Sequence, residues 1–139
     1  MTRRRKPDLV VEWLFERMIC FLAYGDWEVK IYDFKNSKCR RERKTVGLTD
    51  FDKETIYLDK TDGGSDVLIH ELGHIFFQDL LDNEVRNMPK RLLKPHKNFD
   101  RWVEFRILEW EAAFFKRLSK KQVGILEFFI KNAGIAQSL

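Results

Sequence analysis

The stretch that decides the fold lies near the middle of the chain and reads Val67-Leu68-Ile69-His70-Glu71-Leu72-Gly73-His74-Ile75-Phe76. Glu71 is the only acidic or basic residue in a run that is otherwise apolar apart from the two histidines, which predicts a helix buried through a domain, over about residues 66–81. Positions i and i+4 lie one above the other on a helix, so the imidazoles of His70 and His74 reach a single point. Ser65 or Asp66 is suited to cap this helix.

The pattern H-E-x-x-H carries specific chemistry. Two imidazole nitrogens at about 2 Å suit a tetrahedral zinc ion that keeps one position open for water. Glu71, beside the first ligand, can act as general base for that water. The alternative is a pair of core histidines beside a solvent-facing glutamate. Gly73 lowers helix propensity by about 1 kcal/mol, which indicates close packing at this position.

The flanking segments predict an α+β fold. On the N-terminal side, residues 8–24 have a helical period and residues 27–34 alternate as a strand. Residues 45–51 and 55–59 predict two more short strands, which gives a three-stranded meandering sheet packed on the first helix. On the C-terminal side, a helical region begins near residue 100, breaks near Ser119 and ends at about residue 133.

Length and composition fit one domain over residues 1–139, with a basic N-terminal tail at 1–7 and a C-terminal helical segment at 120–139. No apolar run reaches the roughly 18 residues of a membrane span, and the charged N-terminus does not resemble a signal peptide, so we expect a cytoplasmic protein. The two cysteines are expected to be free thiols. Basic clusters at 3–6, 35–44 and 90–97 can bind nucleic acid or acidic partners, but such clusters are more often solvated loops.

Residues 67–76 resemble the active-site helix of the zincin metallopeptidases. The elongated metzincin motif requires Gly and His where this chain has Phe77 and Leu80. The order of elements over residues 9–118 is instead similar to minimal gluzincins and to ImmA/IrrE-type peptidases. This resemblance implies zinc-dependent hydrolysis of a peptide or protein substrate, with a third zinc ligand from a glutamate on the following helix, in a stretch that residues 109–115 match loosely.

Four residues are candidates for that third ligand. Glu111 is favoured, because it borders the small pair Ala112-Ala113, which would let its helix approach the motif helix. Glu104 lies seven residues earlier on the same helical face, whereas Glu109 points away from it. His96 stays a candidate, because residues 95–99 resemble the histidine-bearing stretch of Spartan-like DNA–protein crosslink proteases.

The leading interpretation is a peptidase whose extended substrate lies along a sheet edge. The resemblance to gluzincins implies that residues 55–59 form this edge. One alternative is a regulatory protein with a closed four-ligand zinc site, and another is a nucleic-acid-directed protease. The segment 120–139 is expected to pack on the domain, with self-inhibition by this segment kept as the alternative.

Overall fold

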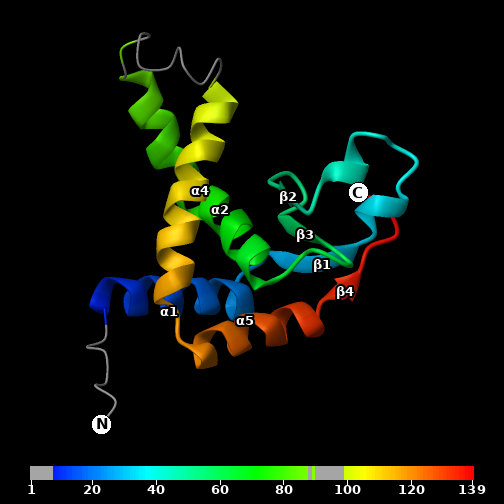
Figure 1. Ribbon diagram of the computed structural model, residues 1–139, viewed down its shortest axis with the longest axis horizontal. Helices are drawn as coiled ribbons and strands as arrows, with labels where there is room; N and C mark the ends of the chain where they lie inside the picture. Colours follow the sequence, from blue (N-terminus) through cyan, green and yellow to red (C-terminus); the bar gives the residue numbers. More distant parts are fainter. Residues whose placement is uncertain (1–7, 88, 90–98) are drawn as a thin grey trace.

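The computed structural model describes residues 8–87, 89 and 99–139 (Figure 1). Its regular elements follow the predicted order and confirm the α+β fold class. They are α1 (Leu9–Tyr24), β1 (Glu28–Tyr32), the short 3-10 helices η1 (Phe34–Asn36) and η2 (Glu42–Lys44), β2 (Gly47–Asp50), β3 (Thr55–Asp59), α2 (Ser65–Arg86), α4 (Phe99–Arg117), α5 (Lys120–Lys131) and β4 (Gly134–Ile135).

The sheet differs from the predicted three-stranded meander. Its strand order is β2-β3-β1-β4, with β1 parallel to both β3 and β4 and with only β2 and β3 antiparallel. The expectation that residues 55–59 form an edge was therefore wrong. β3 is buried along its whole length between two neighbours, and the edge strands of the described sheet are β2 and β4. An alternating pattern predicts that a segment forms a strand, but it does not predict the position of that strand in the sheet.

One face of the sheet packs on the helices. Val29 and Ile31 of β1 pair with Ile56 and Leu58 of β3, so these four side chains lie on the same face. They join a core cluster supplied by α1, β3, α2, α4 and α5, whose buried members are Val11, Phe15, Met18, Ile56, Leu58, Leu68, Ile69, Leu72, Phe114 and Leu126. The motif helix therefore rests on the sheet through its own apolar residues.

Local signals set the helix boundaries. The Asp8 carboxylate accepts hydrogen bonds from two backbone N–H groups at the start of α1, and Ser119 forms a reciprocal capping box with Gln122 at the start of α5. The predicted break near Ser119 is thus confirmed. α2 runs to Arg86, beyond its predicted end.

The C-terminal half of α2 and the N-terminal half of α4 lie side by side and project away from the sheet (Figure 1). A second apolar cluster of Leu81, Trp102, Val103 and Ile107, with Phe77 packed against it, holds the two helices together. This pairing brings the acidic residues of α4 over the histidines of α2.

The described part of the C-terminal segment packs on the domain, as expected. Leu126 of α5 is fully buried in the main core, and β4 pairs with β1 at the sheet edge opposite β2. Within the described ranges, none of the helices combines the length and the apolar character that crossing a bilayer requires. Cys20 and Cys39 are both exposed free thiols.

Candidate metal centre

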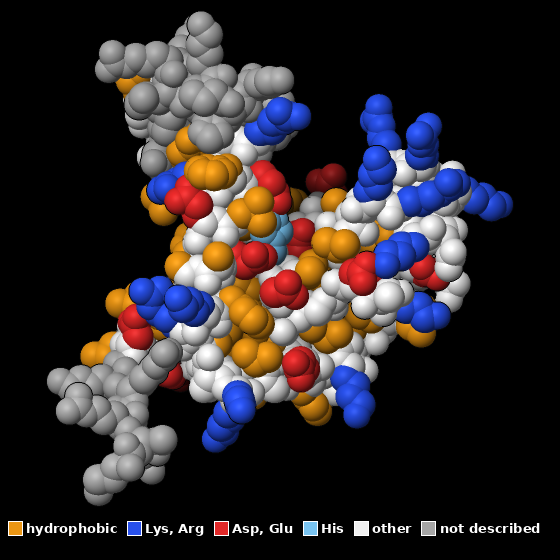
Figure 2. Space-filling view, in the orientation of Figure 1, with side chains coloured by type: hydrophobic (Ala, Val, Ile, Leu, Met, Phe, Trp, Pro, Cys, Tyr) orange, Lys and Arg blue, Asp and Glu red, His pale blue; other side chains and the backbone are white. Residues whose placement is uncertain are grey.

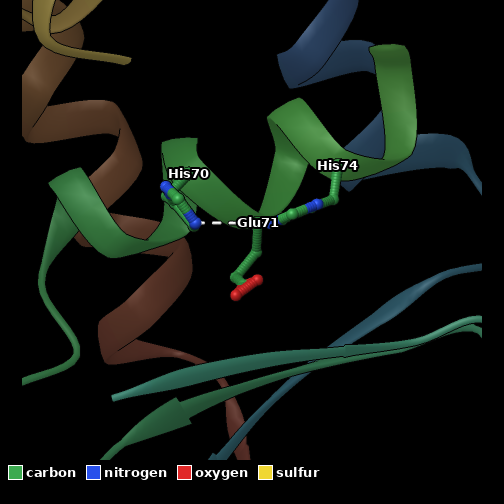
Figure 3. Close-up of side chains that lie close together, drawn as sticks. All are labelled: His70, Glu71 and His74. Carbon is green, nitrogen blue, oxygen red and sulfur yellow. Dashed lines mark hydrogen bonds between the residues drawn. The ribbon is translucent and has the colours of Figure 1, made fainter. Parts of the chain in front are cut away.

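His70 and His74 meet on one face of α2, as their spacing predicts (Figure 3). Their Nε2 atoms lie 3.3 Å apart, and both side chains are largely buried. Two imidazole ligands of a tetrahedral zinc ion, each about 2.0–2.1 Å from the metal, would have their nitrogens roughly 3.3–3.4 Å apart. The pair therefore has the separation that a shared zinc ion requires.

The carboxylate of Glu104 on α4 lies beside both Nε2 atoms. Its Oε1 lies 2.6 Å from Nε2 of His70, and its Oε2 lies 3.0 Å from Nε2 of His74. The carboxylate thus faces the same two nitrogens that face each other. Hydrogen bonds from the two histidines hold the pKa of Glu104 well below its usual range, so the group is a carboxylate at neutral pH.

Glu111 lies on the other side of the His70 ring. Its Oε1 is 3.3 Å from Nδ1 of His70, and it contacts neither Nε2 atom at ion-pair distance. The geometry therefore favours Glu104 over the predicted Glu111 as the third ligand. The two glutamates share a helical face, but two turns separate them, and only the earlier one reaches the point where the Nε2 atoms converge.

The nitrogen that faces Glu111 is otherwise unsatisfied. Nδ1 of His70 is buried and has no partner with hydrogen-bond geometry, because its contact with Glu111 is close but poorly aligned. Burial raises the pKa of the Glu111 carboxyl. Burial is the largest influence on His70 and opposes its charged form. The hydrogen bond that His70 donates to Glu104, together with the charges of the nearby glutamates, outweighs burial and raises the pKa of His70. A small rotation would let Nδ1–H donate to Glu111.

Gly73 explains how α4 comes so close to α2. A Cβ atom at this position would lie 2.7 Å from Cζ3 of Trp110 and 3.2 Å from Cγ2 of Ile107, which is too tight to accept without a shift. The prediction that Gly73 permits close packing is confirmed. The role given to Ala112-Ala113 was wrong, since both alanines face solvent.

Glu71 points away from the histidine face, toward the sheet (Figure 3). Its side chain is buried, and Oε2 accepts a hydrogen bond of 3.0 Å from the Thr49 hydroxyl on β2. Burial is the main cause that raises its pKa. One ligand atom each from His70, Glu71 and His74 can be chosen so that all three lie within 4.8 Å of one another, so the carboxylate stays close to the two histidines.

Two residues of β2 that support this carboxylate were not identified from the sequence. Thr49 supplies the hydrogen bond, and Gly47 lies so close that a Cβ atom would approach Glu71 Cγ at 3.2 Å and Val67 Cγ1 at 2.6 Å. A glycine inside a strand is the available signal, because it often marks a close approach of another element.

Glu109 does not join the site. Glu109 lies 3.7 Å from Arg106 in an i, i+3 pair on the exposed part of α4, as its position predicts. His96 lies outside the described residues. Figure 2 shows the histidines within a hollow, between the α2–α4 pair and the sheet, with acidic side chains around them.

The donor set fits zinc. Among the described residues, two imidazoles and one carboxylate converge on one point, and Glu71 stays on the sheet side, held by Thr49. Three protein ligands with a free position are typical of catalytic zinc sites, whereas structural sites use four. The two histidines are largely buried and Glu104 is half-exposed. A carboxylate behind the ring, as Glu111 is behind His70, is also typical of metal-ligating histidines.

Comparisons of the chain with protein-family models, with curated proteins and with solved structures return no match.

Proposed function

We propose that the protein is a zinc-dependent peptidase in which His70, His74 and Glu104 hold the metal. The observation that carries the proposal is the convergence of both Nε2 atoms and both oxygens of one carboxylate on a single point. The histidine pair alone would also fit a satisfied core pair. A glutamate from a second helix, aimed at the same atoms, favours a ligand set.

Zinc at this position would polarise a substrate carbonyl and lower the pKa of a coordinated water toward about 7. Glu71 is placed to take a proton from water, since its carboxylate lies near the ligand atoms but belongs to a different face of α2. Burial raises its pKa, which moves a carboxylate toward the range where general bases work at neutral pH.

Glu111 has a separate role in this proposal. A carboxylate beside Nδ1 of His70 favours the tautomer that carries its proton on Nδ1 and leaves Nε2 free to bind the metal. Glu111 therefore orients His70 and is not itself a ligand. This assignment also keeps one coordination position open, which supports catalysis over a closed regulatory zinc site.

In this proposal the peptide substrate binds along β2, here called the substrate seat. Its inner side pairs with β3, and it is an edge of the described sheet, so its outer backbone groups can pair with an extended peptide. Gly47 and Thr49 place this edge directly beside Glu71. A peptide added there would pass the metal and the base together.

The test compares zinc content and hydrolysis in three proteins. His70→Ala should lose stoichiometric zinc, whereas Glu71→Gln should keep it and hydrolyse a broad panel of unstructured peptides at least ~10²-fold more slowly than the wild type. Glu109→Gln, on the exposed side of α4, is the matched control and should behave as the wild type. Zinc retention in His70→Ala, or equal hydrolysis rates in Glu71→Gln and the wild type, would reject the proposal.

A further inference from the structure

The connection between β1 and β2 carries a dense group of cations at residues 38–44, a segment here called the basic loop. Its five exposed cations are Lys38, Arg40, Arg41, Arg43 and Lys44. In Figure 2, Lys and Arg side chains gather over this connection, across the hollow from the α2–α4 pair. The proposed metal site is acidic. The hollow therefore has negative charge at the proposed metal site and positive charge at the rim formed by the basic loop.

The basic loop is held in a defined shape. Phe34 is fully buried and its backbone N–H donates to the buried carboxylate of Asp59. Arg43 Nε donates to the carbonyl oxygen of Ser37 at 2.9 Å. These contacts hold the backbone of the loop, so its shape does not have to form when a partner binds.

The one acid within the basic loop is turned inward. Glu42 accepts hydrogen bonds from the hydroxyls of Ser37 and Tyr32. Lys35, just before the loop, pairs with Asp62. Over the described ranges, no carboxylate lies at ion-pair distance from the five loop cations. Their charge is thus directed to solvent without a local counter-charge.

The basic loop leads directly into the proposed substrate seat. Lys44 precedes Gly47 by three residues and Thr49 by five, and these two β2 residues lie beside Glu71. Lys44 ends η2 and β2 begins at Gly47, so an extended rise of about 3.3 Å per residue sets upper limits of roughly 10 Å from Lys44 to Gly47 and 17 Å to Thr49. A peptide that pairs with β2 would reach the loop within about three to five residues.

We propose that the basic loop binds an acidic segment of the peptide substrate, about three to five residues from the bond that is cleaved. This inference rests on the proposed function and adds the substrate class to it. A peptide can place neutral residues at the acidic centre and its carboxylates at the loop. A nucleic acid would bring phosphates toward Glu71, Glu104 and Glu111, and residues 35–46 contain no aromatic side chain on which a base could stack.

The test measures binding, so it does not depend on hydrolysis. Fluorescein-labelled peptides of identical length would carry a block of four Glu, or four Gln, at either end of a neutral extended centre, and fluorescence anisotropy would be read at low and high salt. The variant Arg40→Gln/Arg41→Gln/Lys44→Gln removes three charges but keeps Arg43, which supports the loop. The matched control Lys116→Gln/Lys120→Gln/Lys121→Gln removes three exposed charges near the junction of α4 and α5.

We expect the wild type and the control to bind one Glu-block peptide about tenfold more tightly than the Gln-block peptide, and the loop variant to lose this preference. High salt should also reduce the preference of the wild type and the control for the Glu-block peptide. Equal binding of Glu and Gln peptides, or equal loss in both triple variants, would overturn the inference. So would loop-dependent binding of single-stranded DNA without any preference for the Glu block. Failure of the proposed function would instead appear as zinc retention in His70→Ala or as unchanged hydrolysis in Glu71→Gln.

Discussion

The Thr49 hydroxyl on β2 donates a 3.0 Å hydrogen bond to Oε2 of Glu71 on α2. This contact joins the edge of the sheet to the carboxylate beside the metal-ligand face. Because β2 is also the proposed seat of the peptide, the same strand would hold the substrate backbone and the base. In that proposal, β2 would set the distance between Glu71 and the bond that is cleaved, because it contacts both.

Replacing Thr49 with Val should slow hydrolysis without loss of zinc. The change keeps the shape of the side chain but removes the donor, so Glu71 is held less firmly. We expect a fall in kcat of about tenfold with little change in KM. Thr49→Ser should restore the rate, and Thr45→Val, which removes a hydroxyl in the loop before β2, should have no effect. A Ser variant as slow as the Val variant would contradict a role for the hydroxyl.

The two glutamates of α4 should differ in their effect on zinc. Glu104→Gln removes a proposed ligand and should weaken zinc affinity by at least ~10³-fold. Glu111→Gln changes only the carboxylate beside Nδ1 of His70, and loss of a group that orients a metal-binding histidine typically costs about 10–100-fold in affinity. Competition with a chromophoric chelator measures both affinities. A larger loss in Glu111→Gln than in Glu104→Gln would return the assignment to the residue that the sequence favours.

Adding one methyl group at Gly73 should destabilise the protein. A Cβ there lies 2.7 Å from the Trp110 ring, and overpacking of this kind typically costs about 1–3 kcal/mol, more than the gain in helix propensity. Urea denaturation of Gly73→Ala should show the loss. Gly124→Ala is the matched control, because no atom lies within 4 Å of its added Cβ, and it should stabilise the protein by about 0.5–1 kcal/mol. Equal shifts in the same direction would contradict the close contact between the helices.

Truncating Leu126 to Ala should lower the free energy of unfolding by about 2–5 kcal/mol, since the side chain is fully buried in the main core. Phe128→Ala, on an exposed position of the same helix, should change it by no more than about 0.5 kcal/mol. Hydrolysis by the folded Leu126→Ala protein should not rise. A faster rate would instead indicate that α5 restrains the site.

The sequence predicts the parts of this site that depend on local spacing. The face shared by His70 and His74 follows from the helical period, and the helix break follows from the capping chemistry of Ser119. The position of Gly73 also indicated a close helix contact, which Trp110 makes. The first two features are set by residues within about one turn of one another, whereas the glycine indicated a close contact without indicating its partner.

Features that depend on how elements pack could not be predicted in the same way. Glu104 and Glu111 have the same helical phase, and the offset between α2 and α4 decides which one reaches the Nε2 atoms. That offset is set by apolar contacts such as Leu81 with the Trp102 cluster. Strand order likewise depends on pairing across the sheet, which is why the strand at residues 55–59 was assigned to the wrong position.

The pairing of β1 with β4 has a consequence for synthesis. Lys30 pairs with Gly134 and Ile31 with Ile135, so this ladder joins segments from opposite ends of the sequence. Long-range parallel pairing forms slowly, because the entropy of closing a large loop is lost before the strand contacts form. On the ribosome, residues 9–111 can emerge long before the sheet is complete. Leu126 of α5, which precedes β4 in the chain, is fully buried in the main core. The apolar residues of α1 and α2 that α5 covers would therefore stay exposed until this segment leaves the exit tunnel, and during that interval chaperones could bind them.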